Sequence, residues 1–329
     1  MTDATSTRDT PPDRPRLLVD LDALARNYAR LVDASGKAEA GAVVKADGYG
    51  LGADAVVRRL WREGCRTFFV ANVDEGAEVR ALAEDAAVYV FNGLMPGEED
   101  RVLSLGLSPV LNAPDQLDRW LDARERRRDA VAAALFLDTG MNRLGFSPAQ
   151  TSRVLDRTDL NGDEVDLFVS HFACAPTPDH PMNAEQIKRF SQLVGLHRTR
   201  FPKARASLCN SAGVFLGEAA HFDVTRPGIA LYGGAPHEDR SIAMEAVARL
   251  TAPILQVRDL APGDAVGYGA EHVVDRPMRA ATVALGYADG FLRGAGGRGY
   301  GVLAGRRTPI MGRVSMDLIT VDVTQAGAA

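Results

Sequence analysis

The segment Gly41-Ala-Val-Val-Lys45-Ala-Asp-Gly-Tyr49-Gly-Leu-Gly52 places one lysine between a short apolar run and a glycine-rich turn. Loss of solvent at the end of an apolar run favours a neutral amine, and a neutral amine attacks aldehydes to form a Schiff base. The glycines at 48, 50 and 52 would let backbone N–H groups approach an anion. This combination suits pyridoxal phosphate. The alternative is a strand-end lysine that points to solvent.

A second segment, Asp138-Thr-Gly-Met-Asn142-Arg143, follows the apolar run at 133–137. A guanidinium in such a turn could form a forked pair with a carboxylate, or it could be an ordinary surface arginine. Histidine 171 (Ser170-His171-Phe172-Ala173) follows the run at 166–169. It is either a hydrogen-bonded structural histidine or a base.

Three further segments have polar or exposed groups at turns. Asn210-Ser211 resembles a helix N-terminus, which could bind phosphate or simply cap the helix. Arg226, before Pro227, could act in a site or form half of a buried ion pair. Tyr268 stands between two glycines, an arrangement that packs poorly but exposes a phenol.

The elements that must position these residues alternate between short apolar runs and longer amphipathic stretches, which indicates a parallel sheet covered by helices. Because the first ~235 residues hold about eight strand candidates, we predict a closed (β/α)₈ barrel rather than an open doubly wound sheet. Active residues of such barrels follow the C-terminal ends of strands, where Lys45, Asp138, His171, Asn210 and Arg226 stand. The predicted strands are 42–44, 67–70, 87–91, 109–111, 133–137, 166–169, 206–208 and 222–224, and the predicted helices include 53–63, 74–84, 115–127 and 184–200.

After about Met244 the sequence changes to short β-like pieces separated by turn residues. We therefore predict a disordered N-terminal segment at 1–15, a barrel at 16–243 and a mainly β domain at 244–329.

Composition narrows the possible partners. The 329 residues carry a net charge of −5 with both signs well mixed, so nucleic acid and anionic membrane surfaces are not expected partners. There is no long apolar run, and the three cysteines show neither a disulfide framework nor metal-ligand spacing. We expect a cytoplasmic protein with reduced thiols, no metal and a small-molecule substrate.

Taken together, the segments resemble alanine racemase, a barrel-type (fold type III) pyridoxal-phosphate enzyme. The resemblance covers nearly the whole chain. The motifs occur in the family's order: Val43-Val-Lys-Ala-Asp-Gly-Tyr-Gly-Leu-Gly, Asp138-Thr-Gly-Met-Asn-Arg-Leu-Gly, Ser170-His-Phe-Ala, Asn210-Ser, Arg226-Pro-Gly-Ile-Ala-Leu-Tyr-Gly, Gly267-Tyr-Gly-Ala, Leu285-Gly-Tyr-Ala-Asp-Gly and Gly312-Arg-Val-Ser-Met-Asp.

The resemblance implies a two-base racemisation of alanine that supplies D-alanine for peptidoglycan. Lys45 would bear pyridoxal 5'-phosphate and serve the D-face of the substrate, while Tyr268 of the partner subunit would serve the L-face. A homodimer with shared active sites is thereby implied. The cofactor-binding residues would be Lys45, Tyr49, His171, Asn210, Ser211, Arg226, Gly228 and Ile229, and the substrate-binding residues Arg143, Met316, Asp317 and Tyr287.

Two departures from the family pattern stand out. Phe136 occupies the position where many relatives have a carbamylated lysine that holds the substrate arginine, so either Arg143 is held by another group or substrate affinity is altered. The chain also stops at Ala329, where relatives continue for roughly forty residues, so we expect an incomplete β domain. Three other interpretations remain open: a low-activity or inactive homologue, a pyridoxal-phosphate-dependent amino-acid decarboxylase, and a non-catalytic carrier of the cofactor.

Overall fold

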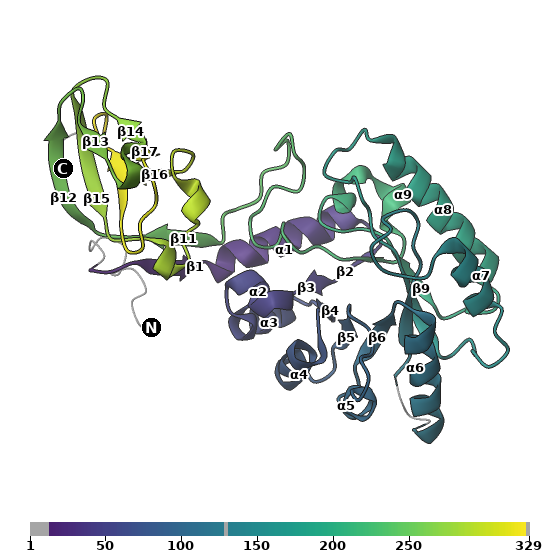
Figure 1. The fold of residues 1–329 in the computed structure, drawn as a ribbon. Coiled ribbons are helices and arrows are strands. Elements are labelled where there is room, and N and C mark those ends of the chain that lie inside the picture. Colours follow the sequence, from purple (N-terminus) through teal and green to yellow (C-terminus); the bar gives the residue numbers. More distant parts are fainter. Residues whose placement is uncertain (1–12, 128–130, 327–329) are drawn as a thin grey trace. The chain divides into compact units, whose positions relative to one another are not determined.

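The computed structural model describes residues 13–127 and 131–326. The chain divides into two compact units, residues 19–248 and residues 249–329 together with the chain up to residue 18 (Figure 1). Each unit is described below by itself. Most of the segment predicted to be disordered, residues 1–15, lies outside the described residues.

The larger unit is built on short parallel strands. Seven pair in sequence order, and an eighth, β10, pairs in parallel with β2, which continues into β3 after one residue. Each predicted strand of this unit therefore has a counterpart in the structure. The strands are β2 (Glu39–Ala40), β3 (Ala42–Val43), β4 (Thr67–Val70), β5 (Ala87–Val90), β6 (Ser108–Leu111), β7 (Ala133–Phe136), β8 (Val165–Val169), β9 (Arg205–Ser207) and β10 (Val224–Thr225).

Backbone hydrogen bonds on both sides of β10 close these strands into a barrel. On one side, the N–H groups of Gly41 and Val43 donate to the carbonyls of Thr225 and Pro227 at 3.0 and 2.9 Å. On the other side, the Arg226 N–H donates to the carbonyl of Cys209 at 3.0 Å. Gly41 must be glycine here, since a Cβ would lie 2.9 Å from the Phe69 ring. The closed-barrel prediction is confirmed.

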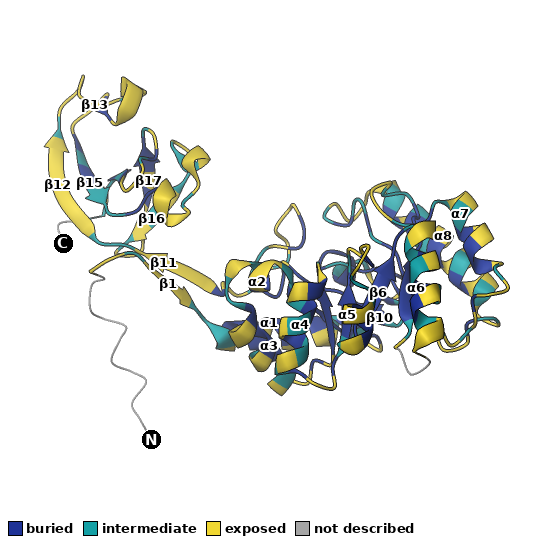
Figure 2. Cartoon of the chain, turned by 60° about the horizontal axis from the view of Figure 1, so that its bottom comes forward, coloured by how far each residue is buried: buried dark blue, intermediate teal, exposed yellow. Residues whose placement is uncertain are grey.

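Helices surround the strands, and Figure 1 shows α3 to α6 outside β3 to β6. Their buried faces follow three- and four-residue spacing, as in α3, where Val56, Val57 and Leu60 are buried. Figure 2 shows that the strands of the larger unit are buried and that the outer faces of its helices are exposed. The helices are α1 (Leu21–Ser35), α2 (Lys45–Gly50), α3 (Ala53–Arg62), α4 (Val73–Leu82), α5 (Glu99–Ser104), α6 (Pro114–Arg126), α7 (Pro148–Leu155), α8 (Pro181–His197), η1 (Gly213–Leu216) and α9 (Glu218–His221).

The barrel interior is apolar in the middle and polar near the N-terminal ends of its strands. Phe69, Tyr89 and Phe136 belong to a buried interior cluster. Near the N-terminal end of β8, the Tyr89 hydroxyl donates to Asp166 at 3.0 Å. The other oxygen of Asp166 is buried and has no hydrogen-bond partner among the described residues. Burial raises the pKa of Asp166 to about 6, although the nearby Arg205 guanidinium opposes this rise.

We expect Asp166→Asn to stabilise the protein at neutral pH. The pKa of Asp166 is higher in the folded state than in the unfolded state, where it is near 4. Protonated Asp166 therefore favours folding below pH 4, and this contribution is lost as the pH rises through about 6. The difference amounts to at most about 3 kcal/mol. Thermal unfolding should show a higher midpoint temperature for the variant than for the unaltered protein at pH 7.5. At pH 4 the two midpoint temperatures should be equal. An unchanged or lower midpoint at pH 7.5 would contradict this account.

The smaller unit is mainly β, as predicted. Its main sheet has five antiparallel strands in the order β12-β15-β18-β17-β16. Its core includes Ala281, Ile310, Ile319 and Val321, whereas the edge strand β12 is exposed along most of its length. Two strands cross the boundary between the units by one residue each: β1 (Arg16–Val19) and β11 (Ala248–Thr251). The other elements are β12 (Ile254–Leu260), β13 (Ala265–Val266), η2 (Tyr268–Ala270), β14 (His272–Val273), β15 (Met278–Val283), η3 (Tyr287–Asp289), η4 (Arg293–Ala295), β16 (Tyr300–Leu303), β17 (Arg306–Met311) and β18 (Ile319–Asp322).

None of the helices within the described ranges combines the length and the apolar character that a membrane span requires.

Candidate active site

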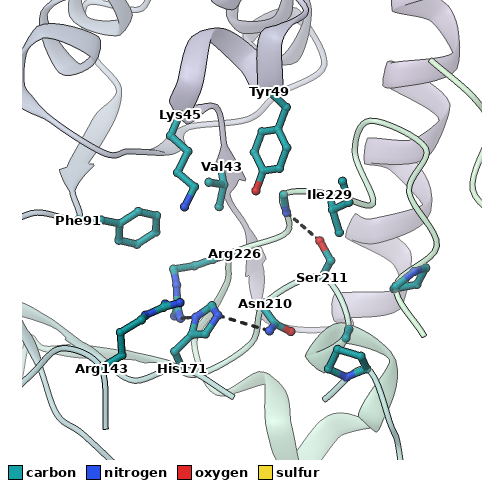
Figure 3. A pocket seen from close by; sticks show the side chains of 14 residues that line it. Val43, Lys45, Tyr49, Phe91, Arg143, His171, Asn210, Ser211, Arg226 and Ile229 are labelled. Atoms are coloured by element: carbon teal, nitrogen blue, oxygen red, sulfur yellow. Dashed lines mark hydrogen bonds between the residues drawn. The ribbon is translucent and has the colours of Figure 1, made fainter. Parts of the chain in front are cut away.

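A pocket of about 240 Å³ lies at the C-terminal ends of the barrel strands, where (β/α)₈ barrels hold their active sites. Figure 3 shows Lys45 and Tyr49 pointing into it from one side, with Arg143, His171 and Arg226 gathered on the other. The lining residues are Val43, Lys45, Tyr49, Phe91, Arg143, His171, Pro176, Asn210, Ser211, Ala212, Arg226, Gly228, Ile229 and Pro236.

Lys45 follows β3 and is only half-buried, and its amine lies 5.8 Å from the centre of the Phe91 ring. The side chain therefore lines the pocket and does not extend freely into solvent. Of the two alternatives raised by the sequence, the structure favours a lysine available to a bound aldehyde.

The chain after Lys45 forms a left-handed turn. Ala46, Asp47, Gly48 and Tyr49 have φ values of 53°, 54°, 61° and 59°, so the segment labelled α2 is not an ordinary right-handed helix. Residues with a Cβ avoid this region at a cost of about 1–2 kcal/mol each. Such strain is often found where function fixes the backbone.

The glycines of this turn do not line the pocket, so the expectation that they approach an anion is not met. The N–H groups of Gly48 and Gly52 instead donate within the turn, to Val44 O at 2.9 Å and Asp47 O at 3.0 Å.

A different group of polar atoms, around Ser211 and Tyr49, lines the pocket. The Ser211 hydroxyl accepts hydrogen bonds from the N–H groups of Gly228 and Ala230 at 2.8 and 3.2 Å. A Cβ on Gly228 would clash with the Tyr49 hydroxyl, so glycine is needed for this close approach. The Tyr49 ring stacks on Tyr232 with centroids 4.5 Å apart. Hydroxyl groups such as those of Ser211 and Tyr49 are among the groups that bind phosphate, whereas the N–H groups of Gly228 and Ala230 donate to Ser211 in this structure.

Arg226 is a buried cation that pairs with no carboxylate of the residues described by the structure. Its guanidinium donates to Ser170 O at 2.5 Å, to Leu208 O at 3.4 Å and to the Ser207 hydroxyl. Burial lowers the pKa of Arg226 to about 10, which still leaves it charged at neutral pH. The alternative of a buried ion pair is therefore wrong, because carbonyl and hydroxyl oxygens hold this charge.

His171 lies between Arg226 and Asn210, with its Nδ1 3.4 Å from Arg226 Nη2 and its Nε2 3.5 Å from Asn210 Nδ2. Both neighbours present N–H groups, and a neutral ring can accept from only one of them. We assign the proton to Nε2, so that Nδ1 accepts from Arg226 and Asn210 Nδ2 makes no hydrogen bond to the ring. Burial, reinforced by Arg226, Arg143 and Lys45, lowers the pKa of His171 to about 3. His171 is thus neutral at physiological pH.

This shift makes His171 a source of acid sensitivity. Below pH 6.5, His171 binds a proton in the unfolded state but stays neutral in the folded state. The free energy of unfolding therefore decreases as the pH falls from 6.5 towards 3. The slope is about 1.4 kcal/mol per pH unit. Urea unfolding of the cofactor-free protein from pH 6 to pH 4 should therefore decline less steeply for His171→Asn than for the unaltered chain. Parallel declines would refute this assignment.

The turn that carries Arg143 is held through its backbone. Asp138 Oδ1 accepts hydrogen bonds from the N–H groups of Gly140, Met141 and Asn142 at 2.9, 3.0 and 3.2 Å. The Arg143 side chain is exposed and has no hydrogen bond or ion pair to any described residue. Phe136 is packed in the barrel interior and supplies no charge.

Gln186, on α8, is a residue that the sequence analysis missed. It is fully buried, donates to Thr139 Oγ1 at 3.1 Å and His171 O at 2.9 Å, and accepts from Ala173 N–H at 2.9 Å. It thereby ties the Arg143 turn to the strand end that carries His171. The sequence pattern could have indicated that Gln186 is buried, since it lies on the same helix face as the buried residues Phe190 and Val194.

The remaining predicted site residues belong to the smaller unit. Tyr268 is 70% exposed in η2, Tyr287 and Met316 are also exposed, and Asp317 follows Met316 in a turn. The exposure expected for a phenol between two glycines is confirmed. The role of these four residues in the site stays a prediction.

Charge in the pocket has one sign. Lys45, Arg143 and Arg226 line it, and none of the lining residues is acidic. The site is therefore suited to an anionic ligand, and more than one negative group can be neutralised.

A lysine-bearing (β/α)₈ barrel joined to a separate β unit defines the class of this protein. The family model "Alanine racemase, N-terminal domain" matches residues 19–236, and "Alanine racemase, C-terminal domain" matches residues 247–329. The chain belongs to the alanine racemase family.

Relatives and solved structures agree with this membership. An alanine racemase of Rhodospirillum rubrum is 48% identical over 94% of this chain and 82% of its own length, and a catabolic alanine racemase of Rhizobium johnstonii is 46% identical over 94% and 81%. The crystal structure of alanine racemase from Bartonella henselae with covalently bound pyridoxal phosphate has a TM-score of 0.88 at 33% identity, over 96% of this chain and 88% of that one.

Proposed function

We propose that this protein interconverts L-alanine and D-alanine with pyridoxal 5'-phosphate attached to Lys45. The observation that carries the proposal is the pocket itself, which places the amine of Lys45 opposite Arg226 and His171 with no acidic residue in the lining. Membership of the alanine racemase family and the cofactor in the Bartonella henselae structure support the same conclusion.

The residues present fit this cofactor. Lys45 supplies a primary amine for its aldehyde, and Tyr49, Ser211 and the backbone of Gly228 and Ile229 would hold its phosphate. The glycine at 228 leaves room for the tyrosine hydroxyl where a side chain would clash. Arg226, with His171 and Asn210 behind it, would face the ring from the other side.

Racemisation needs two proton-transfer groups on opposite faces of Cα. When bound, the cofactor supplies an electron sink for the pair left after the α-proton departs. Lys45 removes or returns the proton on the D-face, and Tyr268 of the partner subunit does so on the L-face. A single base would have to cross from one face to the other, so two fixed groups shorten the path of each proton.

His171 and Arg226 prepare the tyrosine for this role. A free phenol has a pKa near 10, so the site must favour the phenolate. The Nε2–H of neutral His171 is a donor, and the permanent charge of Arg226 lies behind it, 3.4 Å from Nδ1. A hydrogen bond and a nearby cation both stabilise a phenolate. Tyr268 of the partner subunit would meet this pair at the pocket.

Arg143 would hold the substrate carboxylate. Because its guanidinium has no partner among the described residues, the substrate would be its counter-ion. We expect Arg143→Leu to raise KM for alanine by about 10- to 100-fold, with a smaller effect on kcat, since charge-assisted hydrogen bonds contribute about 1.5–3 kcal/mol. Steady-state kinetics with both enantiomers would measure this.

The matched control is Arg153→Leu, which removes an exposed arginine from α7. Its KM should equal that of the unaltered protein. An Arg143→Leu variant with unchanged KM would exclude this residue from carboxylate binding.

We also propose a cytoplasmic homodimer in which Tyr268, Tyr287, Met316 and Asp317 complete the partner's site. The backbone of Met316 would help Arg143 to orient the substrate, and Tyr287 and Asp317 would lie near the mouth of the site. The product, D-alanine, would serve peptidoglycan synthesis.

The test is incubation of the purified protein with pyridoxal phosphate and L-alanine in D₂O, followed by chiral chromatography and mass spectrometry. Formation of α-deuterated D-alanine is the expected result. Carbon dioxide and an amine would instead indicate a decarboxylase, and cofactor binding without deuterium incorporation would indicate a carrier or an inactive homologue.

A further inference from the structure

The left-handed turn after Lys45 begins at the peptide that joins Lys45 to Ala46. The Ala46, Asp47 and Tyr49 backbones all lie in a region that residues with a Cβ avoid. The direction of the Lys45 side chain depends on how this peptide is oriented. A turn of this kind persists only when surrounding groups hold it.

The end of the turn is held by aromatic packing. Tyr49 stacks on Tyr232, whose hydroxyl donates to Val43 O at 3.0 Å. Within the turn, Asp47 Oδ1 accepts from the Ala53 N–H at 2.6 Å and so connects it to the start of α3. These contacts hold the later residues of the turn. None of them involves the peptide N–H of Ala46 at its start.

Glu75, in the first turn of α4, holds that first peptide. Its Oε1 accepts a hydrogen bond from the Ala46 N–H at 2.8 Å, and its Oε2 accepts one from the Ala71 N–H at 2.7 Å. One carboxylate therefore ties the chain after β3 to the chain after β4. Asn72 caps α4 by accepting from the Glu75 N–H at 3.0 Å, which fixes the position of the glutamate on the helix.

The chemistry of these bonds favours a carboxylate. Both acceptors are oxygens of one carboxyl group, and hydrogen bonds to a charged acceptor are about twice as strong as those to a neutral one. The position in the first turn of a helix also stabilises a negative charge. A glutamine would keep one acceptor oxygen but would direct an NH₂ group at one of the two N–H donors.

We propose that Glu75 is a positioning residue for Lys45, because its two oxygens hold the start of the left-handed turn that directs the lysine into the pocket. The proposal rests on the proposed function for its catalytic meaning. Glu75 does not line the pocket, so it acts through the backbone of Ala46.

The first test measures the turn itself. Hydrogen exchange of the cofactor-free full chain, followed by mass spectrometry of a peptide covering residues 45–52, should be about 10-fold faster or more in Glu75→Ala than in the unaltered protein. Glu78→Gln is the control, since Glu78 is exposed on the same helix. This substitution removes one negative charge, as Glu75→Ala does. It should exchange as the unaltered protein does. Equal exchange in Glu75→Ala would overturn the proposal.

The second test measures where Lys45 points. Pyridoxal phosphate is added to the cofactor-free chain, the attachment is trapped with borohydride, and the modified Lys45 peptide is counted over time. Attachment should be about 10-fold slower or more in Glu75→Ala, less affected in Glu75→Gln and unchanged in Glu78→Gln. A role limited to stability would lower the thermal midpoint without slowing attachment to the folded chain, and that result would overturn the proposal.

The two tests separate this proposal from the proposed function. If Lys45 of the unaltered chain accepts no cofactor, the proposed function fails. Hydrogen exchange over residues 45–52 still decides whether Glu75 holds the turn.

Discussion

Replacing Lys45 by alanine is expected to lower alanine racemisation by roughly 10⁴-fold or more in both directions. The variant loses the amine that would attach the cofactor and also the proton-transfer group on one face of the substrate. The pocket offers no replacement, because Lys45 is the one lysine among its lining residues. Chiral chromatography of the product, started from L-alanine and from D-alanine separately, measures both directions.

Lys188→Ala is a suitable control, since Lys188 is exposed on α8 and lies outside the pocket lining. Its rate should match that of the unaltered chain. Adding a small primary amine such as methylamine to Lys45→Ala should restore part of the activity by returning a base to the pocket. Racemisation by Lys45→Ala at more than a hundredth of the normal rate would rule out the proposed role.

The second large effect is expected for Tyr268→Phe, which should lower racemisation by about 10²- to 10⁴-fold. The hydroxyl is the only group lost, and substitutions at such an exposed position change stability little, so the loss of activity would report on the reaction. The effect should depend on the face of the substrate. In D₂O the variant should still exchange the α-proton of D-alanine, which Lys45 serves, while exchange of the α-proton of L-alanine should be lost.

Tyr300→Phe removes a hydroxyl from another exposed tyrosine of the same unit and serves as the control. It should leave both exchange reactions unchanged. If Tyr268→Phe slowed exchange of the two enantiomers equally, the assignment of Tyr268 to one face would have to be abandoned.

Much of the barrel could be predicted because its strands are apolar and end in polar residues. Lys45, His171, Asn210 and Arg226 each follow such a run, and parallel strands bring their C-terminal ends to one face. The strands are short and almost wholly buried, so no alternation of buried and exposed residues in the sequence specified their pairing. Closure depended on β10, which has only two residues and forms bonds on both sides.

The conformation of the turn after Lys45 could not be predicted in the same way. Its glycines suggested anion binding, whereas the left-handed conformation also includes Ala46 and Tyr49, whose types disfavour it. Tertiary contacts decide the outcome, and the partners, Glu75 and Tyr232, lie far away in the sequence. The sequence of residues 45–52 alone therefore does not reveal that Glu75 and Tyr232 hold this turn.

Arg226 illustrates a second limit. A buried arginine usually has a carboxylate partner, and the sequence analysis offered that alternative. The carbonyls of Ser170 and Leu208 accept its hydrogen bonds instead. Every residue has a backbone carbonyl, so the sequence does not show which carbonyls will accept hydrogen bonds from a buried arginine. Only the folded structure, which brings the strand ends together, identifies them.

Ionic strength should control how quickly anions reach this pocket. Three positive side chains without an acidic neighbour in the lining produce a field that extends beyond the mouth and attracts a phosphorylated cofactor from solution. The screening length is about 8 Å at physiological salt and about 3 Å at 1 M, so added salt confines that attraction to the immediate opening. Loading of the cofactor is then a steered diffusional encounter, fast in dilute buffer and progressively slower as counter-ions accumulate around the barrel face.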